Sequence, residues 1–194
     1  MPARTRHTAL HAAPHAALRL ARLSALVAPL TFLAPAAGAQ LRDPVQITAS
    51  RLAQANALSD RAASLYGSAK KFKQAATLHV RAADLRAPGD ARGYEDLNMA
   101  GHLYRAAGDA GRAREAMERA AEQAAARGDV FAAAKSYVDA GYLAIEERRS
   151  DRVPALALKA ELLAGSPLLS DEQRAAIMGR IGKETRLADA VDRP

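Results

Sequence analysis

The sequence predicts an all-α domain of about three antiparallel helical hairpins, closed by a C-terminal capping helix. Alanine is abundant, and together with leucine, arginine and glutamate it favours helix, because these side chains lose little freedom there. No run of alternating valine, isoleucine, threonine or aromatic residues reaches strand length between turn signals. Turn-forming pairs such as Gly108-Asp109 and Gly128-Asp129 divide the middle of the chain into helix-sized segments.

Residues 1–39 have the order of a secretory signal peptide. Four arginines and no acidic residue precede an apolar run at 23–33, and the small residues Ala37 and Ala39 stand just before Gln40. We expect cleavage after Ala39 and export to the periplasm or the extracellular space. No stable membrane anchor is expected after cleavage, because the apolar run is well short of the roughly 20 residues of a spanning helix. An organellar transit peptide, also rich in arginine, is the alternative.

The first hairpin follows a short lead-in. Residues 40–47 contain Pro44 and are expected to be extended, after which Thr48 or Ser50 could cap a helix that runs toward Gly67. A turn at 68–71 leads to a second helix over about 72–86. Pro88-Gly89 ends this helix, because proline cannot continue it and glycine accepts the left-handed conformation of a helix stop.

Two further hairpins and a final helix are expected downstream. Hairpin two pairs a helix that starts near 93–94 with one over about 110–127, and hairpin three opens near Ala133 and carries Pro154 in the first turn of its second helix. Ser170 and Gln173 form a capping box, which begins a last helix that continues to about Leu187. The helical domain is therefore expected over 48–187, with a disordered tail over 188–194.

Hairpin two resembles the tetratricopeptide repeat (TPR) family. Its first helix has Leu97, Ala100, Gly101 and Tyr104 at the spacing of that repeat, and small residues recur along its second helix. The resemblance covers about 57–167, and implies an α-solenoid in which Gly101 allows the two helices to approach closely. The 38 positions from Tyr66 to Tyr104 exceed the 34 of the standard repeat, so a related class of α-solenoid is the alternative.

Catalytic and metal-binding patterns are missing from the predicted mature chain. Its two histidines, His79 and His102, fall on different predicted helices, and we expect His79 to be a hydrogen-bonded ring in the core. The chain has no cysteine, which excludes disulfides, thiolate metal sites and a lipid-modified cysteine. No glycine-rich phosphate loop with its lysine is present. We therefore expect no enzymatic activity, no cofactor and no metal.

The positive charge of the chain does not indicate a nucleic-acid partner. The formal net charge is +7, but four of the 28 basic residues lie in the predicted signal peptide. The remaining 24 basic and 21 acidic side chains are mixed along the chain, which is typical of solvated helix faces.

The TPR resemblance also implies a binding groove. In that family the first helices of successive hairpins line a concave surface that binds a peptide or a helix of a partner protein. The positions of this chain that match the groove are Asp60, Ser64, Glu95, Asn98, His102, Arg105, Lys135, Val138 and Tyr142. We therefore expect a non-catalytic protein-interaction scaffold of the bacterial cell envelope. The alternative is a structural protein that self-assembles into a homo-oligomer through its alanine-rich helices.

Overall fold

The described part of the chain is all-helical. The computed structural model describes residues 44–191 and the side chains of 48–190, so the predicted signal peptide and its cleavage site lie outside the described residues. Within this range there are seven α-helices and no strand. Their bounds are α1 Pro44–Ala63, α2 Phe72–Asp84, α3 Ala91–Ala106, α4 Ala110–Ala126, α5 Val130–Glu146, α6 Val153–Ala164 and α7 Asp171–Val191.

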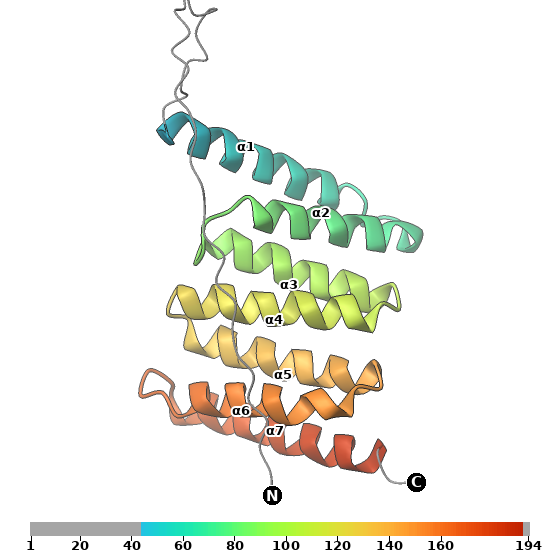
Figure 1. The fold of residues 1–194 in the computed structure, drawn as a ribbon, viewed down its shortest axis with the longest axis vertical. Helices are drawn as coiled ribbons and strands as arrows, with labels where there is room; N and C mark the ends of the chain where they lie inside the picture. The colour runs from blue at the N-terminus through green and yellow to red at the C-terminus, as the bar shows by residue number, and fades with distance from the viewer. Residues whose placement is uncertain (1–43, 192–194) are drawn as a thin grey trace, which may run out of the picture. The chain divides into compact units, whose positions relative to one another are not determined.

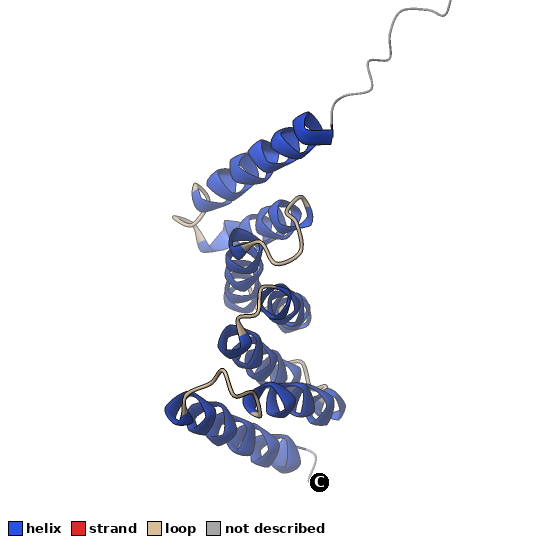
Figure 2. Ribbon diagram, turned by 90° about the vertical axis from the view of Figure 1, so that its left-hand side faces the viewer, coloured by secondary structure: helices blue, strands red, loops and turns tan. Residues whose placement is uncertain are grey.

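The helices pack in the order of the sequence. Each helix lies against the next one, from α1 on α2 to α6 on α7, and α7 also contacts α5 (Figure 1). Figure 2 shows the same succession after a turn of 90°, with helices joined by short loops. No helix in the described range is long and apolar enough to cross a membrane. The prediction of an all-α domain is confirmed.

Aspartate caps fix where three of the helices begin. The side chain of Asp90 accepts a hydrogen bond from the backbone N–H of Arg92 at 2.8 Å, and Asp109 and Asp129 cap α4 and α5 in the same way. Each of these side chains satisfies an N–H that has no partner within its helix. At the turns before them, Gly89, Gly108 and Gly128 have φ of +79°, +75° and +79°. Glycine adopts this conformation without the steric cost that a side chain adds.

Two predicted helix starts are confirmed. Pro154 lies in the first turn of α6, and α7 begins with the predicted pair of hydrogen bonds. The backbone N–H of Ser170 donates to Gln173 Oε1 at 3.0 Å, while the N–H of Gln173 donates to Ser170 Oγ at 3.1 Å. This reciprocal pair is the predicted capping box.

Both predicted ends of the helical domain were wrong. Helix α1 begins at Pro44, so the expected extended lead-in over 40–47 does not hold for its last four residues. Proline is compatible with the first turn of a helix, where its missing N–H would have no partner. Helix α7 continues to Val191, so most of the predicted disordered tail over 188–194 is helical. Ala188 is buried, and its packing extends the helix beyond Leu187.

Small residues dominate the core, and one glycine lies where two helices are in close contact. Leu97, Tyr104 and Met117 are buried among many alanines. A Cβ on Gly101 would lie 2.7 Å from Met117 Cε and 3.0 Å from its Cγ, so an alanine here would force the Met117 side chain to shift. The close contact between α3 and α4 predicted at Gly101 is confirmed.

Candidate functional site

Helices α3 and α5 together line two hollows. One contains Tyr94, Met99 and Phe131, and we call it the Met99 hollow; the other, beside Tyr142, we call the Tyr142 hollow. An ion pair joins the carboxyl-terminal ends of the two helices. In this pair, Arg105 Nε donates to Glu146 Oε2 at 3.1 Å. Hydrogen bonding to Glu146 and the charge of that carboxylate raise the pKa of Arg105. Helices α3 and α5 thus contribute to one face with two depressions.

The Met99 hollow is the more apolar of the two and has a volume of about 450 Å³. Most of its surface is apolar, and the polar side chains in its lining are those of Glu95, Asn98 and Lys135, together with Tyr94. Asn98 Nδ2 donates to the hydroxyl oxygen of Tyr94 at 3.2 Å, which fixes the amide beside the hollow. The complete lining is Tyr94, Glu95, Asn98, Met99, Phe131, Ala132 and Lys135. A mainly apolar hollow with a few fixed polar groups is typical of a site that binds an apolar side chain.

The Tyr142 hollow is smaller, about 170 Å³, and is rich in charge. Asp139 accepts from Arg180 of α7 and also from Lys135 Nζ at 3.0 Å. The Arg180 guanidinium lies 5.6 Å from the centre of the Tyr142 ring, close enough for a cation–π interaction. The complete lining is Gly101, His102, Arg105, Met117, Asp139, Tyr142, Leu143 and Arg180. Several of these charges are therefore already paired within the chain.

Six of the nine predicted groove residues line these hollows. Glu95, Asn98 and Lys135 lie at the Met99 hollow, whereas His102, Arg105 and Tyr142 lie at the Tyr142 hollow. Asp60 is exposed on α1 and Ser64 is exposed in the turn after it, and neither lines a hollow; the hydroxyl of Ser64 donates to the carbonyl of Arg61 at 2.7 Å.

The prediction for Val138 was wrong. Its side chain is 1% exposed and belongs to the hydrophobic core. The reason is that α5 packs against three helices, α4, α6 and α7, so more of its circumference is buried than in a helix with two neighbours.

The groove assignment from the sequence missed nine of the fifteen residues that line the hollows, and four of these give the hollows much of their apolar surface and charge. Met99 and Phe131 supply apolar surface at one hollow, while Asp139 and Arg180 supply charge at the other. The sequence carried a signal for Met99, because it stands one turn from Glu95 on α3. It carried none for Arg180, because the return of α7 onto α5 is a tertiary contact.

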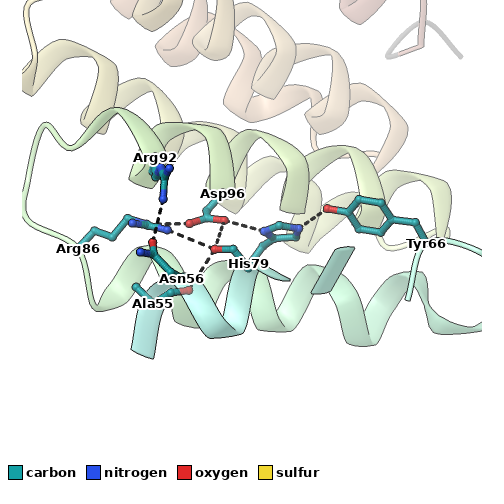
Figure 3. Close-up of polar contacts among 8 residues, drawn as sticks. Ala55, Asn56, Tyr66, His79, Arg86, Arg92 and Asp96 are labelled. Atoms are coloured by element: carbon teal, nitrogen blue, oxygen red, sulfur yellow. Dashed lines mark hydrogen bonds and ion pairs between the residues drawn. The ribbon is translucent and has the colours of Figure 1, made fainter. Parts of the chain in front are cut away.

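A buried polar network joins α1, α2 and α3 (Figure 3). Asp96 is at its centre and is 5% exposed. Its carboxylate lies 2.7 Å from His79 Nδ1 and 2.9 Å from Arg86 Nε, and it accepts from the hydroxyl of Ser59 at 2.8 Å. The second ring nitrogen of His79, Nε2, forms a hydrogen bond with the hydroxyl of Tyr66. In a neutral ring, an Nδ1 that donates to the carboxylate leaves Nε2 as the acceptor for that hydroxyl.

The network is a structural element outside the groove. Burial alone would raise the pKa of Asp96, but hydrogen bonds from His79, Ser59 and Arg86 outweigh it and hold the pKa below its usual value. For Tyr66, burial and the nearby Asp96 charge raise the pKa, which disfavours the phenolate that a nucleophile would need. None of these side chains lines either hollow. The expectation of a hydrogen-bonded core histidine at position 79 is confirmed.

A second buried acid lies where α7 meets α5. Glu184 is 0% exposed, and neither of its carboxylate oxygens has a hydrogen-bond partner within the described part of the chain. The carboxylate lies against the Cα of Gly141 and leaves no room for a Cβ there. Burial raises the pKa of Glu184 to about 8, although nearby Arg180 lowers it and Asp139 raises it further. The side chain is therefore held mostly as the neutral acid at neutral pH.

Among the described residues, no three histidine or carboxylate side chains converge in a way that could hold a metal ion. Comparisons with protein-family models, with curated proteins and with solved structures find no match to this chain.

Proposed function

We propose that this chain is a non-catalytic protein-interaction scaffold that binds a peptide or a helix of a partner protein along the face made by α3 and α5. The observation that carries the proposal is the apolar Met99 hollow, with Glu95, Asn98 and Lys135 around it. We further propose that the fold is a TPR-like solenoid, with α1–α2, α3–α4 and α5–α6 as its hairpins and α7 as its cap. The order of the helices and the close approach at Gly101 support this assignment.

Binding would combine an apolar anchor with polar positioning. A partner side chain that enters the Met99 hollow would bury apolar surface against Met99 and Phe131. Asn98 and Lys135 would then select the register of the bound segment by hydrogen bonds and charge. Because helices carry these groups, little conformational freedom is lost on this side of the interface when the partner binds.

A random-sequence peptide library displayed on phage tests the groove. Peptides selected on the wild-type chain should bind the Met99→Lys variant at least tenfold more weakly, because a charge would enter the apolar hollow. Met178→Lys is the matched control: the two methionines are 39% and 44% exposed, and Met178 lies on α7 outside both hollows. Equal loss of binding in both variants, or no selected peptide above background, would overturn the proposal.

We propose that the scaffold works in the cell envelope after export. The motivating observation is the signal-peptide pattern of residues 1–39. Amino-terminal sequencing of the protein from an envelope fraction should begin at Gln40. A cytoplasmic chain that still carries Met1 would refute this part of the proposal and leave the groove assignment unaffected.

A further inference from the structure

Helix α6 exposes an apolar stripe. Leu158 and Leu162 are one turn apart and are 55% and 72% exposed, and Leu168 in the turn that follows is 74% exposed. Pro154 and Ala155 are also exposed and lie on the same side of the helix by its periodicity. The opposite side, with Leu156 and Ala160, is buried in the core. A helix that is apolar on both sides is usually covered on both.

Helices α2 and α4 hold the same place as α6 in their helix pairs, and they show which residues the solvent-facing side of such a helix carries. The side of α2 that faces solvent carries Lys73, Gln74 and Arg81, and that of α4 carries Arg112, Glu115 and Glu122. These faces are charged and need no cover. Only α6 among the three second helices has leucines there, so its composition is not explained by the position of the helix in the fold.

Basic side chains follow one edge of the stripe. Arg152 precedes α6 by one residue and Lys159 lies two helical turns further on, so both point along the same edge. Neither has a carboxylate within ion-pair distance in the described part of the chain, although the Lys159 ammonium lies 4.9 Å from the centre of the Tyr137 ring. A hollow of about 310 Å³ beside the stripe is lined by both residues and also by two carboxylates, Glu118 and Asp151, of which Glu118 is paired with Arg114. Nearby Arg149, in contrast, is already paired with Asp151.

We propose that this surface docks an amphipathic helix of a second protein, with leucine-like residues on the face toward Leu158 and Leu162 and acidic residues along the edge toward Arg152 and Lys159. The apolar stripe requires the first property and the two unpaired cations require the second. The site is separate from the Met99 and Tyr142 hollows and does not depend on the function proposed for them.

A second copy of this chain is a poorer occupant. In an antiparallel two-fold pair of α6 helices, each edge meets its own copy, which brings Arg152 and Lys159 against the same cations of the partner. A parallel pair sets these two cations against Glu161, the single acidic residue on the opposite edge. An acidic partner helix neutralises both cations and avoids this mismatch.

A photo-crosslinking residue at position 162 of the full chain, introduced in living cells, tests the proposal. The matched control carries the same residue at Arg119, whose side chain is 42% exposed on α4. We expect a crosslinked product at position 162 only, and the crosslinked peptide, sequenced by mass spectrometry, should contain leucine-like residues at helical spacing with aspartate or glutamate beside them. The Arg152→Glu and Lys159→Glu double variant should lower the yield at least fivefold; circular dichroism of the purified variant establishes that it is folded.

Three results would overturn the proposal. One is a crosslinked peptide that comes from a second copy of the chain, which would assign the stripe to self-association. Another is a crosslinked peptide without acidic residues, or a yield that the charge reversal leaves unchanged. The third is no product at position 162 above that at position 119.

Discussion

At the scale of single residues, Gly141 and Glu184 depend on each other. The carboxylate of Glu184 occupies the space that a Cβ on Gly141 would fill. Gly141→Ala should therefore lower the free energy of unfolding by about 1–3 kcal/mol, because the buried acid has to move or the helices have to separate. Urea denaturation followed by circular dichroism measures the change.

Gly179→Ala is the matched control on α7. No atom lies within 4 Å of a Cβ on Gly179, so alanine there should raise the free energy of unfolding by roughly 0.5–1 kcal/mol through its better helix propensity. If both alanine variants stabilised the protein, the contact between Gly141 and Glu184 would have no energetic weight.

Arg148 carries backbone strain that glycine would relieve. It has φ of +60°, in a turn position that glycine occupies at residues 89, 108 and 128. Arg148→Gly should raise the midpoint of thermal unfolding by a few degrees, since the strain of about 1–2 kcal/mol exceeds the entropy that glycine adds to the unfolded chain. Arg149→Gly, where φ is −117°, should lower the midpoint instead. An unchanged or lower midpoint for Arg148→Gly would contradict the assignment of strain.

At the scale of helices, the Asp96 network holds the first hairpin to the second. Asp96→Ala should destabilise the protein by about 3–5 kcal/mol, because it leaves the Arg86 guanidinium buried without its carboxylate. The double variant Asp96→Leu with Arg86→Met removes both charges and should recover most of this loss. Chemical denaturation of the single and double variants compares them. Equal loss in both would mean that shape, and not charge pairing, explains the contribution of the network.

The helices were predictable from the sequence where local chemistry determines them. Asp90, Asp109 and Asp129 follow turn signals and cap the helices, and the capping box of Ser170 is a local pattern. The two ends of the domain were not predictable in the same way. Pro44 is compatible both with an extended segment and with the first turn of a helix, so it did not identify the start of α1. The extension of α7 beyond Leu187 depends on the packing of Ala188 against other helices.

The groove residues were predictable only in part for a similar reason. The TPR resemblance implied that Glu95, Asn98 and His102 lie on one side of α3, and these three residues do line the two hollows. The burial of Val138 and the place of Arg180 in a hollow depend on the packing of α7 against α5, and no local sequence pattern predicts that packing. The buried carboxylate of Glu184 was missed as well, because charge alone predicts an exposed side chain.

At the scale of the whole described domain, two buried carboxylates give stability opposite dependences on pH. The pKa of Asp96 is lowered by folding, so its contribution is present above the usual aspartate pKa and is lost as the pH falls through the lowered value. The pKa of Glu184 rises from 4.5 to about 8, so its contribution is complete below 4.5 and is lost as the pH rises to about 8. Stability should therefore be highest near about pH 4 to 4.5, between the usual pKa values of the two groups, and fall toward pH 8.

Glu184→Gln separates the two contributions. The neutral amide should remove the decline between about pH 5 and 8, which amounts to a few kcal/mol at most, and leave the acidic limb unchanged. Thermal unfolding of both chains across this range measures the profile. Glu172→Gln, an exposed position on the same helix, should keep the wild-type profile. A decline that persists in Glu184→Gln would assign it to another group.

The packing of each helix on its neighbours in the chain also determines how the domain responds to force. Helix α1 packs mainly on α2, whereas α7 at the other end is held by both α5 and α6. A chain pulled from its two ends should lose α1 first, and the remaining helices should then detach one after another, because each described helix is held mainly by its neighbours in the chain. The force–extension curve should show a series of small steps that begins at the amino-terminal end.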